Sequence, residues 1–130
     1  MKLRSLILGT AMMLTASAAL AQYVDFVEPK NGATVPSTFT VRFAVDGMTV
    51  APAGDMTAGT GHHHLLIDTA DIEENTVIPM DDKHRHFGKG QTETQITLPP
   101  GKHKLTMQFA DGAHRSYGAK YRKTIEVTVK

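Results

Sequence analysis

The sequence predicts a small all-β protein, an antiparallel immunoglobulin-like β-sandwich with one long histidine-containing loop. Three observations predict this class. Short segments alternate apolar and polar residues with the period of two that is typical of half-buried strands. Glycine and proline separate these segments. No stretch shows the 3.6-residue period of an amphipathic helix of ordinary length, and a run of short strands with such turns is typical of sandwich domains.

The expected strands follow one another along the chain. The clearest is TFTVRFAV, where Phe39, Val41 and Phe43 alternate with polar residues and so predict one buried face. The segment LPPGKHKL is similar to the turn before a late strand in immunoglobulin-like and fibronectin-like domains. We expect strands at 23–29, 38–45, 61–68, 94–98, 102–110 and 124–130.

Residues 1–21 predict a secretory signal peptide. Lys2 and Arg4 precede a short apolar run, and small residues lead up to a cleavage site near Ala21. The apolar run is too short for a membrane span, and no second run of spanning length follows. We therefore expect a periplasmic or extracellular protein without a membrane span, in which residues 22–130 form a single β-sandwich domain.

Composition limits the partners of the mature chain. It has no cysteine, so burial rather than disulfides must hold the fold. Cleavage would remove two basic residues and leave 12 against 13 acidic ones, which changes the formal net charge from +1 to −1. This balance excludes a strongly basic nucleic-acid surface. An exposed edge strand would allow either a monomer or a pair of chains.

The stretch 69–93 does not fit the pattern of short strands. It has about 25 residues with little alternation, which is longer than a plain connection in a compact domain. Several apolar residues within it argue against disorder. We expect this loop to pack on one end or edge of the sandwich.

The segment GHHHLLID places three consecutive histidines in an expected strand. If Leu65 and Ile67 face the core, His63 shares their side. His62 and His64 then point to the opposite side, roughly 6.5 to 7 Å apart along the chain. This spacing lets both rings reach one cation.

One interpretation is a metal site of four histidines. His84 and His86, in the long loop, repeat the arrangement of His62 and His64. Neutral imidazole is the commonest metal ligand, and nitrogen ligands suit copper or zinc. If the loop folds back onto the strand, the two pairs can meet on one ion. Additional ligands to consider are His63, His114, Met80 and Asp68.

A second interpretation is a hydrogen-bonded network in a non-catalytic binding module for an envelope partner or a small anion. Arg85, Lys89 and Gln91 lie around a glycine-rich turn and would contact that ligand. The sequence contains no nucleophile elbow, HExxH motif or paired-carboxylate motif, which disfavours an enzyme. His103 shares the parity of apolar Leu105, so we expect it to be structural, with its ring bonded to backbone or loop.

Three long sequence motifs resemble those of a known protein family. GHHHLLID, IPMDDKHRHFGKGQTET and LPPGKHKLTMQFADGAH together resemble a family of small secreted bacterial proteins known as domain of unknown function 4399, over roughly residues 58–129. The resemblance implies that these histidine, glycine and Gln-Thr-Glu positions belong to one pattern. It implies no particular activity.

Overall fold

The computed structural model describes residues 23–130. The predicted signal peptide, residues 1–21, lies outside the described residues. Within them the structure is built from strands and one short 3-10 helix, so the all-β prediction is confirmed. No helix in this part of the chain is long and apolar enough to cross a membrane.

The elements in chain order are β1 (Val24–Glu28), β2 (Thr34–Val35), β3 (Thr38–Val45), β4 (Thr49–Val50), β5 (Thr60–Ile67), β6 (His84–His86), β7 (Glu93–Thr97), β8 (Gly101–Ala110), η1 (Ala119–Tyr121) and β9 (Arg122–Val129). The strands predicted by alternation are found close to their predicted ends. The sequence missed β2, β4 and β6, because two or three residues are too few to show a period of two.

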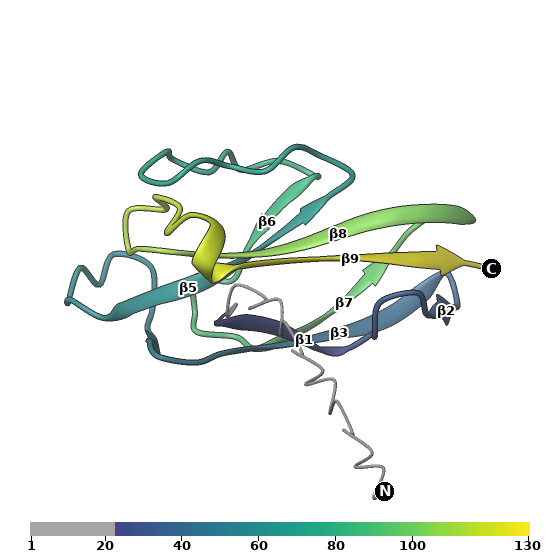
Figure 1. Ribbon diagram of the computed structural model, residues 1–130, viewed down its shortest axis with the longest axis horizontal. Helices are drawn as coiled ribbons and strands as arrows, with labels where there is room; N and C mark the ends of the chain where they lie inside the picture. The colour runs from purple at the N-terminus through teal and green to yellow at the C-terminus, as the bar shows by residue number, and fades with distance from the viewer. Residues whose placement is uncertain (1–22) are drawn as a thin grey trace, which may run out of the picture.

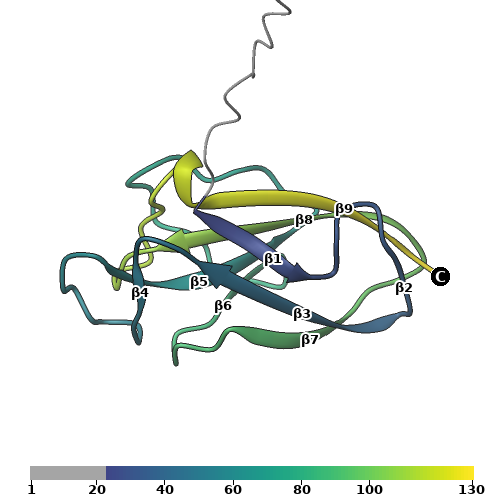
Figure 2. The same cartoon turned by 60° about the horizontal axis from the view of Figure 1, so that its bottom comes forward.

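Two sheets pack face to face (Figures 1 and 2). The first has the order β1-β3-β7, and the second has the order β2-β9-β8-β5-β4, with β6 also paired to β5. The long pairings are antiparallel, as predicted, whereas β2 with β9 and β4 with β5 are short parallel pairs. This strand order does not confirm the immunoglobulin-like arrangement.

The core lies between the two sheets. Alternate residues of β3 are buried, and β8 and β9 contribute inward side chains from the other sheet. Burying each large apolar side chain stabilises the fold by about 1.5 to 3 kcal/mol. The fully buried core side chains include Phe26, Val41, Leu65, Leu105, Met107, Phe109 and Val127.

The predicted long loop covers the outer face of the six-stranded sheet, opposite the three-stranded one (Figure 1). Near its end, β6 pairs antiparallel with β5 and places His86 opposite His64. Its middle bonds to the turn between β8 and β9, since the Ile78 N–H donates to the His114 carbonyl at 2.8 Å. Leu66, on the outer side of β5, is only 1% exposed. The central strand β5 is therefore buried on both faces.

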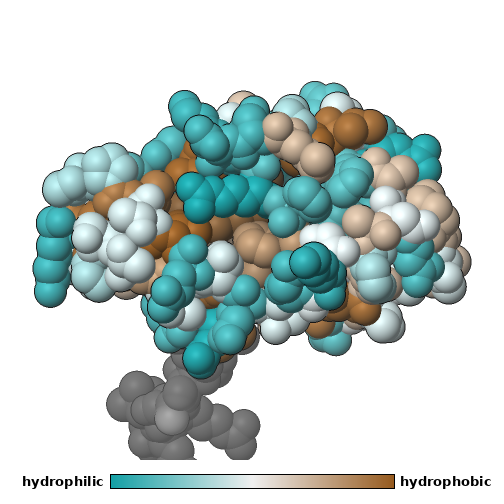
Figure 3. Space-filling view, turned by 180° about the vertical axis from the view of Figure 1, so that it is seen from behind, coloured by the Kyte–Doolittle hydropathy of each residue, from teal (hydrophilic) through white to brown (hydrophobic). Residues whose placement is uncertain are grey.

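The remaining surface is mostly polar. From behind, hydrophilic and neutral side chains cover most of the visible face, and apolar ones show through in places (Figure 3). The exposed large apolar side chains of the described residues are Tyr23, Val27, Met56, Val77 and Met80.

Close approach of β5 to β8 requires the glycine that precedes the histidines. A Cβ at Gly61 would overlap the carbonyl oxygen of Ala110 and lie 2.7 Å from the Phe109 ring. The carbonyl oxygen is part of the backbone of β8 and cannot move independently of that strand. A side chain at this position would push β5 away from β8.

We expect Gly61→Ala to lower the free energy of unfolding by about 1 to 3 kcal/mol, because the added methyl group overpacks the sheet. The measurement is denaturant-induced unfolding. Gly88→Ala is the matched control, since its Cβ would lie 3.1 Å from the Ala53 Cβ and from the edge of the His86 ring. An equal or larger loss of stability in Gly88→Ala would contradict the conclusion that the close approach of β5 to β8 requires glycine at position 61.

Candidate metal centre

Alternation along β5 sorts the three consecutive histidines between its two faces. His63 points into the core, with its ring centre 4.7 Å from that of Phe43 and 4.9 Å from that of Phe109. His62 and His64 lie on the outer side, as the sequence predicted, with ring centres 4.6 Å apart. All three histidines are 0% exposed.

A third imidazole reaches the outer side from the turn between β8 and β9. Asp111 organises this turn: its Oδ1 accepts hydrogen bonds from the backbone N–H groups of Ala113 at 2.8 Å and Arg115 at 2.9 Å. The N–H of His114 donates to the Asp111 carbonyl, and His114 takes the left-handed conformation with φ 63°. A Cβ at Gly112 would collide with the Asp55 backbone, so glycine lets the turn approach its neighbour.

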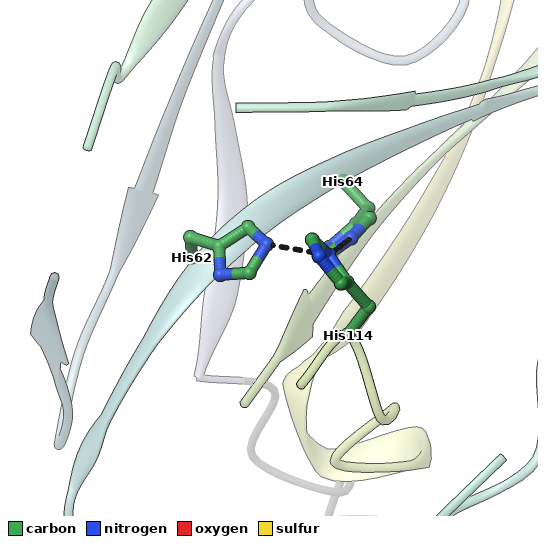
Figure 4. Close-up of side chains that lie close together, drawn as sticks. All are labelled: His62, His64 and His114. Atoms are coloured by element: carbon green, nitrogen blue, oxygen red, sulfur yellow. Dashed lines mark hydrogen bonds between the residues drawn. The ribbon is translucent and has the colours of Figure 1, made fainter. Parts of the chain in front are cut away.

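The three outer imidazoles converge through their ring nitrogens (Figure 4). Nε2 of His62 lies 3.1 Å from Nδ1 of His114, and Nε2 of His64 lies 3.4 Å from the same atom. The ligand atoms of all three lie within 4.8 Å of one another. Two nitrogens bound to one metal at about 2.0 to 2.1 Å, with an angle of about 90° to 110°, are separated by about 2.9 to 3.4 Å. The observed distances fit that separation.

Burial keeps the two strand imidazoles neutral. Burial, followed by the neighbouring His114, lowers the pKa of His62 to about 4. Burial, followed by neighbouring His62, lowers the pKa of His64 to about 2. Both rings therefore keep a free lone pair near pH 7, which metal ligation requires.

The second histidine pair lies beside this cluster. His86 is exposed, and its ring centre lies 5.3 Å from that of His114 and 6.1 Å from that of His64. His84 lies two pairs further along the ladder, opposite Leu66, and its Nδ1 is 2.7 Å from Asp81 Oδ1. Of the four histidines predicted as ligands, His62 and His64 lie in the cluster. His86 lies beside it and is exposed, and His84 contacts the carboxylate of Asp81.

Of the four additional ligands that the sequence suggested, only His114 lies in the cluster. His114, which sequence reasoning treated as a reserve, joins the cluster, whereas His63 faces the core. Met80 is 61% exposed on the long loop. Asp68 is engaged elsewhere, because its two oxygens bond His103 and the Lys104 N–H.

The residues predicted to hold an anion form hydrogen bonds within their own loop. The Lys89 N–H donates to Oε1 of Gln91 at 2.9 Å, so an anion would have to displace that amide. Arg85 Nε lies 3.3 Å from the Asp82 carbonyl oxygen. These contacts do not direct the three side chains toward a common point.

His103 ties the start of the long loop to the turn before β8. Its Nδ1 lies 2.6 Å from Asp68 Oδ2, and its Nε2 lies 2.7 Å from the Pro99 carbonyl oxygen. Both partners only accept hydrogen bonds when Asp68 is ionised, so both bonds form together only with the imidazolium, which donates from two nitrogens. The bond to Asp68 raises the pKa of His103.

Comparison with known proteins identifies a family but no activity. A family model described as "Domain of unknown function (DUF4399)" matches residues 41–130. Curated proteins give no match. Among solved structures, an endo-beta-1,4-mannanase from Thermotoga petrophila matches with 15% identity and a TM-score of 0.44, over 82% of this chain and 19% of that protein. The chain thus spans about a fifth of that enzyme's length.

We expect His63→Leu to stabilise the protein. Both ring nitrogens of His63 are buried without a hydrogen-bond partner among the described residues, and each unpaired polar group costs about 1 to 3 kcal/mol. Burial lowers the pKa of His63 to about 4. The unfolded chain binds the proton near pH 6.5, so the wild type loses stability as pH falls from 6.5 toward 4.

Denaturant unfolding at pH 8 and pH 5 measures this effect. The gain from His63→Leu should be larger at pH 5 by about 1 to 2 kcal/mol. A variant that is less stable than the wild type at both pH values would show that the ring has a stabilising partner.

We expect the opposite pH dependence from His103→Gln. Since the folded pKa of His103 is raised above 6.5, its contribution is fully present below pH 6.5 and disappears as pH rises through the folded value. The substitution should cost about 1 to 3 kcal/mol at pH 6 and less at pH 9, measured by denaturant unfolding. A cost that stays constant from pH 6 to pH 9 would show that the imidazolium is not the bonded form.

Proposed function

The chain belongs to the DUF4399 family, whose description assigns no activity, and we propose from the site geometry that it binds copper or zinc through His62, His64 and His114. One observation carries this proposal: three ring nitrogens from two distant segments lie within 4.8 Å of one another. Imidazole nitrogen is the ligand that both metals accept most readily from proteins without thiolates.

The surroundings make this cluster suitable for a metal ion. His62 and His64 are fixed in the central strand, and hydrogen bonds to Asp111 hold the turn that carries His114. Ligands held in place lose little conformational entropy when they bind. Because the two strand imidazoles are neutral near pH 7, their ligation releases no proton.

The hydrogen-bonded network is less well supported at this cluster. A structural network pairs its buried nitrogens, as His103 does with Asp68 and Pro99. In the described residues, Nδ1 of His62 and Nδ1 of His64 have no hydrogen-bond partner, and the three rings bond only one another. Such an arrangement costs stability, and it is typical of functional sites rather than of structural networks.

The sequence supports a proposal for where this binding takes place. The basic start, short apolar run and small residues before Ala21 are typical of a signal peptide, so we place metal binding in a periplasm or outside the cell. We propose a non-catalytic binding role, since the motifs of hydrolytic enzymes do not occur in the sequence.

Calorimetric titration of the chelator-stripped protein near neutral pH tests the proposal. We expect one equivalent of copper or zinc to bind, with a rise in thermal stability of about 2.7 kcal/mol when free metal is 100 times Kd. His62→Ala, His64→Ala and His114→Ala should each weaken binding by about a hundredfold or more, since the loss of even an outer-shell group costs 10- to 100-fold.

His84→Ala is the matched control, because this histidine bonds Asp81 instead of the cluster. It should leave the affinity within about threefold of the wild type, a difference below about 0.7 kcal/mol. Retained stoichiometric binding in both His62→Ala and His114→Ala would exclude this site, and a large loss in His84→Ala would favour the set of four predicted from sequence.

A further inference from the structure

We propose that the site selects the monovalent cuprous ion, Cu(I), over the divalent ions Zn²⁺ and Cu²⁺. The inference rests on the proposed metal-binding function and deepens it. It depends on three properties of the cluster of His62, His64 and His114: the charge of its ligands, the surroundings of their outer nitrogens and the number of nitrogens that converge.

The ligand set carries no negative charge, and two of its three members are buried while His114 is half-buried. Three imidazoles bring no negative charge, and His62 and His64 are 0% exposed. The cost of moving an ion from water into a medium of low dielectric constant scales with the square of its charge, so a divalent ion pays about four times the penalty of a monovalent one of similar size. Without an anionic ligand to offset that penalty, a neutral buried set favours the lower charge.

The ring nitrogens that would not bind the ion, Nδ1 of His62 and Nδ1 of His64, do nothing to offset its positive charge. A histidine that binds a divalent metal usually donates its other N–H to a carboxylate, a backbone carbonyl or water, which spreads the charge of the ion. Here Nδ1 of His62 and Nδ1 of His64 are buried and have no partner in the described part of the chain. The carboxylate of Asp111 accepts from Arg115 Nε at 3.0 Å and from two backbone N–H groups, so its charge is already balanced.

The number of converging nitrogens points the same way. Three ligands complete the coordination of Cu(I), whereas Zn²⁺ bound to three histidines takes water as a fourth ligand and Cu²⁺ prefers a tetragonal arrangement. The described ligand atoms that lie within 4.8 Å of one another come from three histidines. His86, beside the cluster, is exposed and outside that group. The cluster therefore supplies what a three-coordinate monovalent ion needs.

The test compares the three ions on the same purified protein, with Cu(I) handled without oxygen and each ion competed against a chelator of known affinity. We expect one Cu(I) to bind at least a hundredfold more tightly than Zn²⁺ or Cu²⁺. A hundredfold preference over Cu²⁺ corresponds to a reduction potential about 118 mV above that of the aqueous copper couple.

The outcomes separate this inference from the function on which it rests. Binding of Zn²⁺ or Cu²⁺ as tightly as Cu(I) would overturn the selectivity and leave the metal site standing. Binding of none of the three ions would overturn both.

Two variants of one ligand test the charge argument directly. His114 offers Nδ1, which is as many bonds from Cα as Oδ1 of aspartate or asparagine, and both residues tolerate the left-handed backbone at this position. His114→Asp adds one negative charge to the ligand set, and His114→Asn is its neutral match. We expect the ratio of Zn²⁺ affinity to Cu(I) affinity to be at least tenfold higher in His114→Asp than in His114→Asn.

Equal ratios in the two folded variants would overturn the charge argument. Circular dichroism and thermal unfolding verify that both variants keep the β-structure. If either variant fails to fold, the comparison of the three ions on the wild type decides the proposal alone.

Discussion

Burial of β5 on both faces is the constraint on which the rest of the structure depends. The strand pairs with β8 along one edge and with β4 and β6 along the other, so its backbone groups are satisfied on both sides. The core covers one face, and the long loop covers the opposite face. Polar side chains on such a strand cannot reach solvent. Unless they form hydrogen bonds with one another, their burial destabilises the fold. The convergence of His62 and His64 on His114 follows from this confinement.

Much of the fold was predictable because β-strand alternation is a local property of the chain. Eight residues of TFTVRFAV gave the limits of β3 without error, and the same reasoning assigned His63 to the core and His62 to the opposite side. The partner of the strand histidines was harder to find, since His114 lies in a turn about 50 residues away and reaches them through tertiary packing. The only local signal was the Asp-Gly pair that precedes it, which marks a tight turn. The roles of His84 and His86 depend on the register of β6, and a shift of two residues would place His84 opposite His64.

The cluster also shows where sequence rules and the structure disagree. A strand buried on both faces normally carries aliphatic residues, as the LeuLeuIle segment of β5 does. Three consecutive imidazoles in the same strand are expensive, because their nitrogens need partners that an apolar interior does not provide. Proteins keep such departures from the packing rules mainly at functional sites. By contrast, His103 sits in a strand of the same sheet with both nitrogens bonded, as a stabilising residue does.

The division of the three proposed ligands between two elements has a kinetic consequence. Two of them are held in the buried strand β5, while the third is carried by the turn in residues 111–118, which connect β8 to η1. Small hydrogen-bonded units of this kind open far more often than a whole sheet unfolds. The residence time of a bound ion would then be set by how often that turn opens, and the ion could be handed to an acceptor while the sandwich stays intact.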